Sequence, residues 1–216
     1  MADIKIKVRK YEEKDRPFVR EIACATAFIG KDAGAFFEDR EILADTLTTY
    51  FTDYEPESCF VAESQGDIIG YIIGAKDEAT LNKTQGTKIA KQLFIKALTS
   101  RVLLRNKNTF FLFRCLLSLL KGEFRQPDFY KDYPAILHIN LKEGFRGLGI
   151  GAQLMHAYLG YLKENEIKGV HLATMSDETG AFFSKQGFGL LFSAKRSYFR
   201  HILHQDIAVY IYGRRL

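Results

Sequence analysis

A glycine-rich turn between an apolar run and an amphipathic segment constrains this chain more than any other feature. Residues 146–151 (RGLGIG) follow 134–141 (PAILHINL), which has the composition of a strand, and precede 152–164, where apolar residues recur at helical spacing. Glycines let backbone N–H groups approach a phosphate closely, and the positive end of a helix dipole favours negative charge. Arg146 adds a cationic, forked donor. The segment therefore predicts an α/β fold with an anion-binding loop.

Two common phosphate-binding loops do not match this turn. A dinucleotide-binding fold places GxGxxG after its first strand, with an acidic residue about 20 positions later, whereas residues 146–151 lie far along the chain. A P-loop requires GK[ST] at the start of its helix, where this chain has Gly151, Ala152 and Gln153. The turn therefore belongs to another class of anion-binding loop.

Length and composition indicate an ordinary globular protein. The chain has 216 residues, of which 47% are hydrophobic and 26% charged, which fits a single domain spanning residues 1–216. The three cysteines, Cys24, Cys59 and Cys115, cannot all pair and form no CxxC motif. We therefore expect buried, reduced thiols and a cytoplasmic location.

Positive charge is concentrated in one segment of the chain. Residues 76–132 contain 12 Lys or Arg and 5 Asp or Glu, whereas the rest of the chain contains 19 and 21. Such a segment is compatible with an acidic substrate, a membrane surface, nucleic acid or a solvated helical face. Arg105, Lys107 and Arg114 interrupt its most apolar stretch, 102–120, so no membrane span is expected, although a helix lying on a surface is compatible.

Hydrophobic periodicity predicts strands and helices along the whole chain. A first strand lies within residues 1–10, which alternate lysine with apolar residues and so do not resemble a secretory signal. Two helices are expected next, one that starts at Asp15 and Pro17 and has apolar positions as far as Ile29, and one over 37–50. A strand hairpin of 58–63 and 67–75 turns at Gln65 and Gly66, and a helical hairpin lies within 80–120. The strand, loop and helix of 134–164 follow, and a last strand lies at 207–212.

Two motifs together resemble the GNAT superfamily of acyl-CoA N-acyltransferases. Residues 146–151 fit its R/QxxGxG/A loop, and 181–188 (AFFSKQGF) are similar to its later A.FYEK.GF signature. Residues 58–75 resemble its central hairpin, so the likeness covers nearly everything outside 76–132. Residues 133–151 are also similar to the acetyltransferase-like domains appended to some O-GlcNAc hydrolases.

The resemblance implies the fold and a coenzyme site. It implies a mixed central sheet that is flanked by helices and splays between its fourth and fifth strands, where acetyl-CoA binds. Residues 76–132 would then be a basic helical insertion between the third and fourth strands. Glu143 stands where the family usually has proline. By position, the resemblance implies that Ile139, Asn140 and Leu141 contact the pantetheine and acyl carbonyl. It implies that the diphosphate is bound by Arg146, Gly147, Leu148, Gly149, Ile150 and Gly151. Ser176, Phe182 and Phe183 are the further residues implied to contact the coenzyme.

The family's mechanism implies a base and an acid. A neutral amine attacks the thioester, so the reaction needs a group that takes the amine proton and a donor for the departing thiolate. The usual acid is a tyrosine at the position of Phe183, which has no hydroxyl group. Three explanations stay open: Tyr198 substitutes, the thiolate leaves without enzymatic protonation, or activity has been lost.

His138 is the candidate base. In residues 135–141, Leu137, Ile139 and Leu141 share one face of the strand, and His138 shares the other with Asn140. A histidine near its unperturbed pKa accepts a proton at neutral pH. The alternative is a histidine held by hydrogen bonds in the core.

The sequence thus predicts an N-acetyltransferase that moves the acetyl group of acetyl-CoA to a primary amine of a small molecule or peptide. The first alternative is an inactive acyl-CoA-binding module, and a nucleic-acid-binding module is a further alternative that rests on charge alone. No metal is expected, because His201 and His204 lack other ligands at fixed spacing. A homodimer is compatible with the sequence. If the basic insertion faces the acceptor, an acidic or phosphorylated acceptor is favoured.

Overall fold

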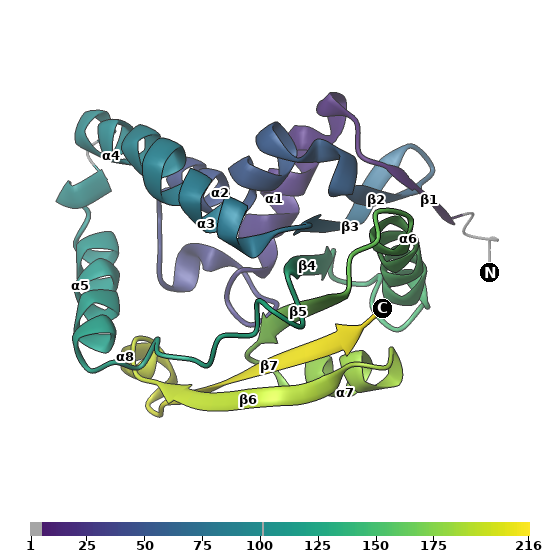
Figure 1. Cartoon of the computed structure of the whole chain (residues 1–216). Helices are drawn as coiled ribbons and strands as arrows, with labels where there is room; N and C mark the ends of the chain where they lie inside the picture. The colour runs from purple at the N-terminus through teal and green to yellow at the C-terminus, as the bar shows by residue number, and fades with distance from the viewer. Residues whose placement is uncertain (1–5, 101) are drawn as a thin grey trace.

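A seven-stranded mixed sheet forms the centre of the molecule (Figure 1). The computed structural model describes residues 6–100 and 102–216. The strand order is β1-β2-β3-β4-β5-β7-β6, and only the β4–β5 pairing is parallel in this described part of the chain. The strands are β1 (Ile6–Lys10), β2 (Phe60–Ser64), β3 (Asp67–Ala75), β4 (Ala135–Leu141), β5 (Gly169–Thr174), β6 (Gly189–Arg196) and β7 (Ile207–Arg215).

Helices cover both faces of this sheet. They are α1 (Arg16–Thr26), α2 (Arg40–Thr49), α3 (Glu78–Thr84), α4 (Ala90–Thr99), α5 (Asn106–Leu120), α6 (Ile150–Glu164), α7 (Asp177–Lys185) and α8 (Arg200–Leu203). None of the helices within 6–100 and 102–216 has the length and apolar character needed to cross a bilayer.

Most of the predicted elements are confirmed. Pro17 lies in the first turn of α1, and β2 and β3 form the expected hairpin around Gln65 and Gly66. One boundary was wrong: α1 ends at Thr26, and Ile29 instead occupies a turn with φ of 54°. Phe28 and Lys31 close that turn by bonding to each other, which stops the helical pattern from continuing.

The sheet opens between β4 and β5, as expected. Ala135 pairs with Val170 and Ile136 with His171, and β4 has no other paired residue on β5 in the described chain. On its other side β4 is paired with β3 as far as Leu141. We call the stretch 137–141 of β4, which lacks a partner on β5, the splay. The mixed, splayed sheet predicted from the sequence is therefore confirmed.

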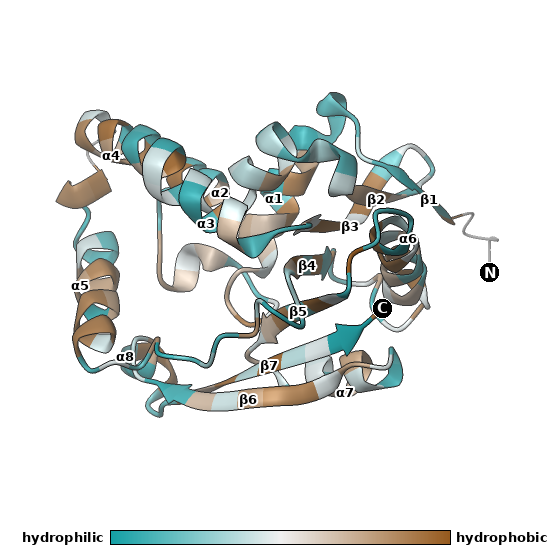
Figure 2. Cartoon of the chain, in the orientation of Figure 1, coloured by the Kyte–Doolittle hydropathy of each residue, from teal (hydrophilic) through white to brown (hydrophobic). Residues whose placement is uncertain are grey.

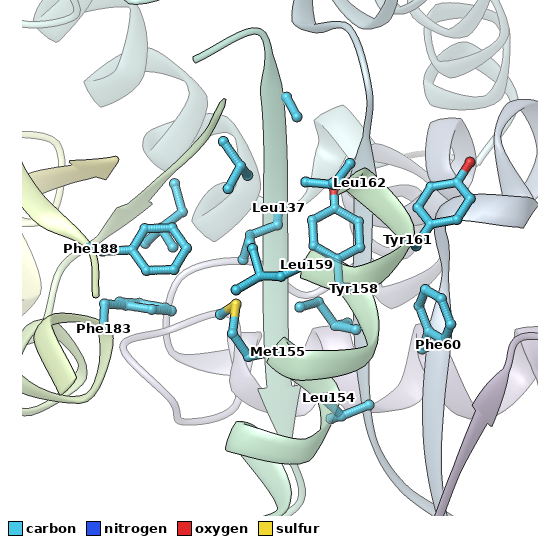
Figure 3. Close-up of a cluster of buried hydrophobic side chains, with 14 of the residues drawn as sticks. Phe60, Leu137, Leu154, Met155, Tyr158, Leu159, Tyr161, Leu162, Phe183 and Phe188 are labelled. Atoms are coloured by element: carbon cyan, nitrogen blue, oxygen red, sulfur yellow. The ribbon is translucent and has the colours of Figure 1, made fainter. Parts of the chain in front are cut away.

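Two hydrophobic cores cover the two faces of the sheet. Leu137 faces the first core, where Leu154, Met155 and Tyr158 of α6 pack across β4 (Figure 3). Tyr71 and Ile73 of β3 face the second core, which contains residues of α1 and the π-helical turn Tyr50–Tyr54. This alternation is the period-2 pattern of strands buried on both faces.

The segment between β3 and β4 is helical but is not a hairpin of two paired helices. In the described part of the chain, α4 packs on α2, whereas α5 does not run alongside α4 (Figure 1). Phe111 of α5 instead packs against Phe36 and Phe199. Phe110 and Phe113 of the same helix are about half exposed. The assignment of 76–132 as an insertion into a single domain stays a prediction.

Candidate coenzyme and acyl-transfer site

The loop after β4 depends on three glycines with left-handed backbone. Gly144, Gly147 and Gly149 have φ of 86°, 80° and 78°, a region that residues with a side chain rarely adopt. Gly149 is the residue that precedes the first turn of α6. No atom lies within 4 Å of the position that a side chain would take at Gly147 or Gly149. These glycines therefore set the backbone path and leave the outside of the loop open.

The same loop presents a row of free backbone donors. The first backbone bond at the start of α6 runs from the Gln153 N–H to the Gly149 carbonyl, at 3.2 Å. The N–H groups of residues 147–152 have no acceptor among the residues that the structure describes. Unsatisfied N–H groups at a helix start carry partial positive charge and attract anions. Anion binding by this loop stays a prediction.

Arg146 lies beside this loop and is exposed. One of its terminal nitrogens donates to the carbonyl of Gly30, at 2.8 Å. Gly30 lies in the turn that follows α1, and its φ of 79° is again left-handed. A side chain at Gly30 would meet the Arg146 guanidinium at about 3.1 Å. The guanidinium therefore links the coenzyme loop to the turn between α1 and α2.

Backbone groups of alternate β4 residues face the splay. Lys142, just beyond β4, donates its N–H to the Ile69 carbonyl at 2.9 Å, so residues with its parity bond across to β3. In an antiparallel pair the intervening residues direct their N–H and C=O groups away from the partner strand. The groups that point toward β5, and have no strand partner there, are therefore those of Ile139 and Leu141 and the carbonyl of Leu137, because the parallel pair of Ile136 with His171 uses the Leu137 N–H.

Asn140 is held differently from its neighbours. Its parity places its backbone groups on the β3 side, opposite Tyr71. Its side-chain amide donates to the Tyr71 hydroxyl at 2.8 Å. Burial raises the pKa of Tyr71, so this hydroxyl stays neutral. Of the three β4 residues expected to bind coenzyme, Ile139 and Leu141 offer free backbone groups and Asn140 does not.

The expected contacts on α7 divide into two kinds. Ser176 precedes α7, and its hydroxyl accepts from the Thr179 N–H at 3.4 Å. The Phe182 ring lies against the start of α6, about 3.2 Å from where a side chain on Gly151 would begin. Phe183 is buried in the first core beside Phe188 (Figure 3). The structure thus brings Phe182 to the coenzyme loop and turns Phe183 inward.

The His138 side chain lies among many protein atoms, and solvent still reaches it. It lies on β4 within the splay, its side chain is exposed, and its ring meets that of Phe51 edge-on at 5.4 Å. Its deep position, with a smaller contribution from His171, lowers the pKa of His138 to about 4. The imidazole is therefore neutral at pH 7 and able to accept a proton. It shares a face of β4 with Asn140, as the sequence predicted.

Tyr198 lies in a separate aromatic cluster. Its ring stacks on Phe124 and meets Phe199 edge-on, and only 5% of its surface is exposed. Its hydroxyl donates to the sulfur of Met175 at 3.7 Å, just before Ser176. Burial raises the pKa of Tyr198. Tyr198 and His138 have no ring neighbour in common among the described aromatic contacts.

Comparison with known families finds a match for one segment of the chain. Residues 116–188, from α5 to α7, match the sequence model of the Acetyltransferase (GNAT) family. The matched segment is about one third of the chain, and over that segment the sequence is similar to this family. A comparison with curated proteins gives no significant match.

Solved structures share the GNAT fold over nearly the whole chain. The structure named SsHAT has a TM-score of 0.68 and 24% identity, covering 98% of both chains. A Drosophila melanogaster polyamine N-acetyltransferase, which forms N-acetylagmatine, has a TM-score of 0.60 and 14% identity, covering 98% of this chain and 100% of its own. Ard1 from Thermoplasma volcanium has a TM-score of 0.55 and 17% identity, covering 98% and 97%. These likenesses, at 14–24% identity, show the fold of the chain.

Two contributors to this candidate site were missed in the sequence. The free carbonyl of Leu137 follows from strand parity, which the sequence pattern contains, but the extent of the splay does not follow from it. The Gly30 carbonyl has no sequence signal, because its contact with Arg146 joins positions 116 residues apart. A surface hollow of about 470 Å³ between α1 and α2 includes none of the expected site residues. The described residues contain no group of three or more His, Cys, Asp or Glu placed to hold a metal ion.

Proposed function

We propose that this protein transfers the acetyl group of acetyl-CoA to a primary amine by direct attack. One observation carries the proposal: the free backbone edge of β4 leads directly into a loop with unpartnered N–H groups. A ligand that has a chain with carbonyl and amide groups at one end and a diphosphate at the other matches this order of donors and acceptors. Coenzyme A thioesters have that chemistry.

The roles of the residues follow from their positions. Residues 146–151 hold the diphosphate, and the free backbone groups of Ile139 and Leu141 bond to the pantetheine and the acyl carbonyl. The neutral amine attacks the acyl carbon, so a C–N bond forms and the C–S bond breaks. His138, neutral at pH 7, takes the proton released by the amine. The thiolate leaves with the electron pair of the C–S bond and gains a proton.

The source of that last proton separates two versions of the proposal. Phe183 cannot donate one, and its ring is buried. The Tyr198 hydroxyl lies next to Met175, close in the chain to Ser176, and supports a role as acid. Release of an unassisted thiolate is the other active version. An inactive acyl-CoA-binding protein is the second candidate function, favoured by the absence of a hydroxyl at Phe183.

The acceptor we propose is acidic or phosphorylated. Arg114 donates to the Ser197 carbonyl at 2.9 Å and the Lys121 ammonium to the Ser197 hydroxyl at 3.3 Å, so two cations and one carboxylate, that of Glu123, lie next to Tyr198. Cationic acceptors are the contrasting class, because one structural neighbour forms N-acetylagmatine. Strong saturation by spermidine would argue against an acidic acceptor.

Release of the free CoA thiol over a panel of amines tests this function. An active enzyme releases thiol only when an amine acceptor is present, and His138→Ala slows that release. Calorimetry with acetyl-CoA on the same protein identifies the inactive binder, which binds the coenzyme but releases no thiol with any amine. Absence of coenzyme binding would reject both versions.

A further inference from the structure

Helix α5 packs on a core through Phe111 and Cys115, yet its outward face is also apolar. Its inward positions include Asn108 and Ser118, both fully buried. The outward stripe is apolar, with Leu112, Phe113 and Leu116 all exposed at helical spacing. A helix that served only the core would turn this stripe inward, because burial of large apolar side chains is the main driving force of packing.

The buried polar residues fix this orientation of α5. The Asn108 side chain accepts from the Glu38 N–H at 2.7 Å and donates to the Val102 carbonyl at 3.2 Å. The Ser118 hydroxyl donates to Glu123 at 2.6 Å. Rotating the helix would bury its apolar stripe but would break these bonds and leave buried polar groups unsatisfied. The outward apolar face is therefore a stable feature of the fold.

The exposed apolar face extends onto α4 and the turn between the helices. Of the sixteen exposed large hydrophobic residues of the described chain, eleven lie between positions 94 and 120. Figure 2 shows this concentration as brown along α5 and at the end of α4 beside it. We call these eleven residues the apolar edge: Phe94, Ile95, Leu98, Leu103, Leu104, Phe110, Leu112, Phe113, Leu116, Leu119 and Leu120. Clusters of this kind mark interaction surfaces.

Basic residues accompany the apolar edge. Residues 83–125 contain ten Lys or Arg, and Glu123 is the only acidic residue among them. Lys91 lies on the α4 face that carries Phe94, Ile95 and Leu98, one turn before Phe94. Lys91, Lys107 and Lys121 are exposed. An apolar stripe with basic residues beside it is the pattern of helices that bind anionic lipid surfaces.

We propose that the apolar edge docks on the surface of an anionic lipid membrane. The exposed leucines and phenylalanines enter the boundary between headgroups and acyl chains, while exposed basic residues such as Lys91 and Lys107 meet lipid phosphates. A second copy of the chain fits less well, because a symmetric dimer through this edge would bring two strongly basic segments together. A helical peptide partner would need a groove, and neither described surface hollow is lined by a residue of the apolar edge.

The chain has no tryptophan, so a single introduced tryptophan reports on this edge alone. Leu116→Trp keeps the apolar edge intact, and Leu190→Trp places the same reporter at an exposed leucine on β6. On addition of vesicles of phosphatidylcholine with phosphatidylglycerol, Leu116→Trp should show blue-shifted emission that lipids with spin-labelled acyl chains quench. Leu190→Trp should show neither effect. Identical responses of the two proteins would overturn the proposal.

Vesicle sedimentation of the unmodified protein provides the second measurement. We expect binding to mixed phosphatidylcholine–phosphatidylglycerol vesicles that weakens with salt, and at least about tenfold weaker binding to phosphatidylcholine alone. Phe113→Glu with Leu116→Glu should reduce binding by about tenfold or more, whereas the matched pair Phe18→Glu with Leu190→Glu should not. Acetyl-CoA calorimetry and thermal melts confirm that each variant is folded. No binding by the unmodified protein, or dimerisation that the first pair abolishes without vesicle binding, would overturn the proposal.

Discussion

Arg146 joins two loops that are remote in the sequence, because its guanidinium donates to the Gly30 carbonyl. We expect Arg146→Glu to weaken acetyl-CoA binding by about tenfold or more, since it replaces a charge-assisted donor beside the diphosphate with a repelling carboxylate. Calorimetry measures this change. Arg146→Lys keeps the positive charge but lacks the planar guanidinium donor, so its affinity for acetyl-CoA should fall less than that of Arg146→Glu. If Arg146→Glu binds as tightly as the original protein, Arg146 does not contact the coenzyme.

His138 gives the site a specific dependence on pH. Because its pKa is lowered to about 4, the imidazole is neutral over the physiological range and becomes protonated only as the pH falls toward 4. The acid limb of kcat/KM should therefore lie below pH 6, and His138→Ala should flatten it while lowering the rate at pH 7.

Profiles of kcat/KM for both proteins test this assignment. His156→Ala removes an exposed histidine on α6 and serves as the control, which should keep the original profile. If His138→Ala also keeps the original shape, His138 only packs against Phe51 and another group is the base.

Some residue positions could be predicted from the sequence and others could not. The alternation along β4 correctly placed His138 and Asn140 on one face, because a strand has a fixed period of two. The inward position of Phe183 and the contact of Arg146 with Gly30 were not predictable. Both depend on elements that meet only after the whole sheet has formed.

At the scale of elements, Gly149 before α6 and Gly160 inside it need opposite backbone conformations. Gly149 precedes the helix with φ of 78°, whereas Gly160 lies inside it with open space where a side chain would go. We expect Gly149→Ala to destabilise the protein by about 1–2 kcal/mol, which lowers Tm by roughly 2–8 °C for a chain of this size.

Gly160→Ala is the matched control for that change. It should leave Tm unchanged or raise it, because alanine favours a helix interior by up to about 1 kcal/mol over glycine. Calorimetric melts of both variants give the comparison. Equal Tm values would show that the left-handed turn before α6 is not strained by a side chain.

Elements were predictable where periodicity was strong and local. The β2–β3 hairpin and α6 follow from their sequences, since their apolar positions repeat without interruption. The orientation of α5 was not predictable in the same way. Its apolar stripe favoured a buried face, but the hydrogen bonds of Asn108 and Ser118 turn that stripe outward.

At the scale of the molecule, the sheet consists of two parts joined through few pairs. Strands β1 to β4 form one part, and β5, β7 and β6 form the other, with contact through Ala135 and Ile136 of β4. A ligand bound in the splay contacts both parts of the native state. At about 100 times its Kd, it should stabilise that state by about 2.7 kcal/mol.

Thermal melts with acetyl-CoA measure this stabilisation. We expect Tm to rise by roughly 5–10 °C at that concentration. Adenosine, which has no diphosphate or pantetheine, is the control ligand and should leave Tm nearly unchanged. No rise with acetyl-CoA at any concentration would contradict the coenzyme site.

The one-sided pairing of β4 has a consequence for amide hydrogen exchange. In the free protein, the amides of His138 and Asn140 are bonded to β3 and should exchange slowly, while those of Ile139 and Leu141 should exchange fast. A single strand would then show protection at every second residue. Bound coenzyme should slow the exchange of the unprotected amides alone, because it bonds to backbone groups that have no partner strand. The difference in exchange rate between odd and even positions would then decrease.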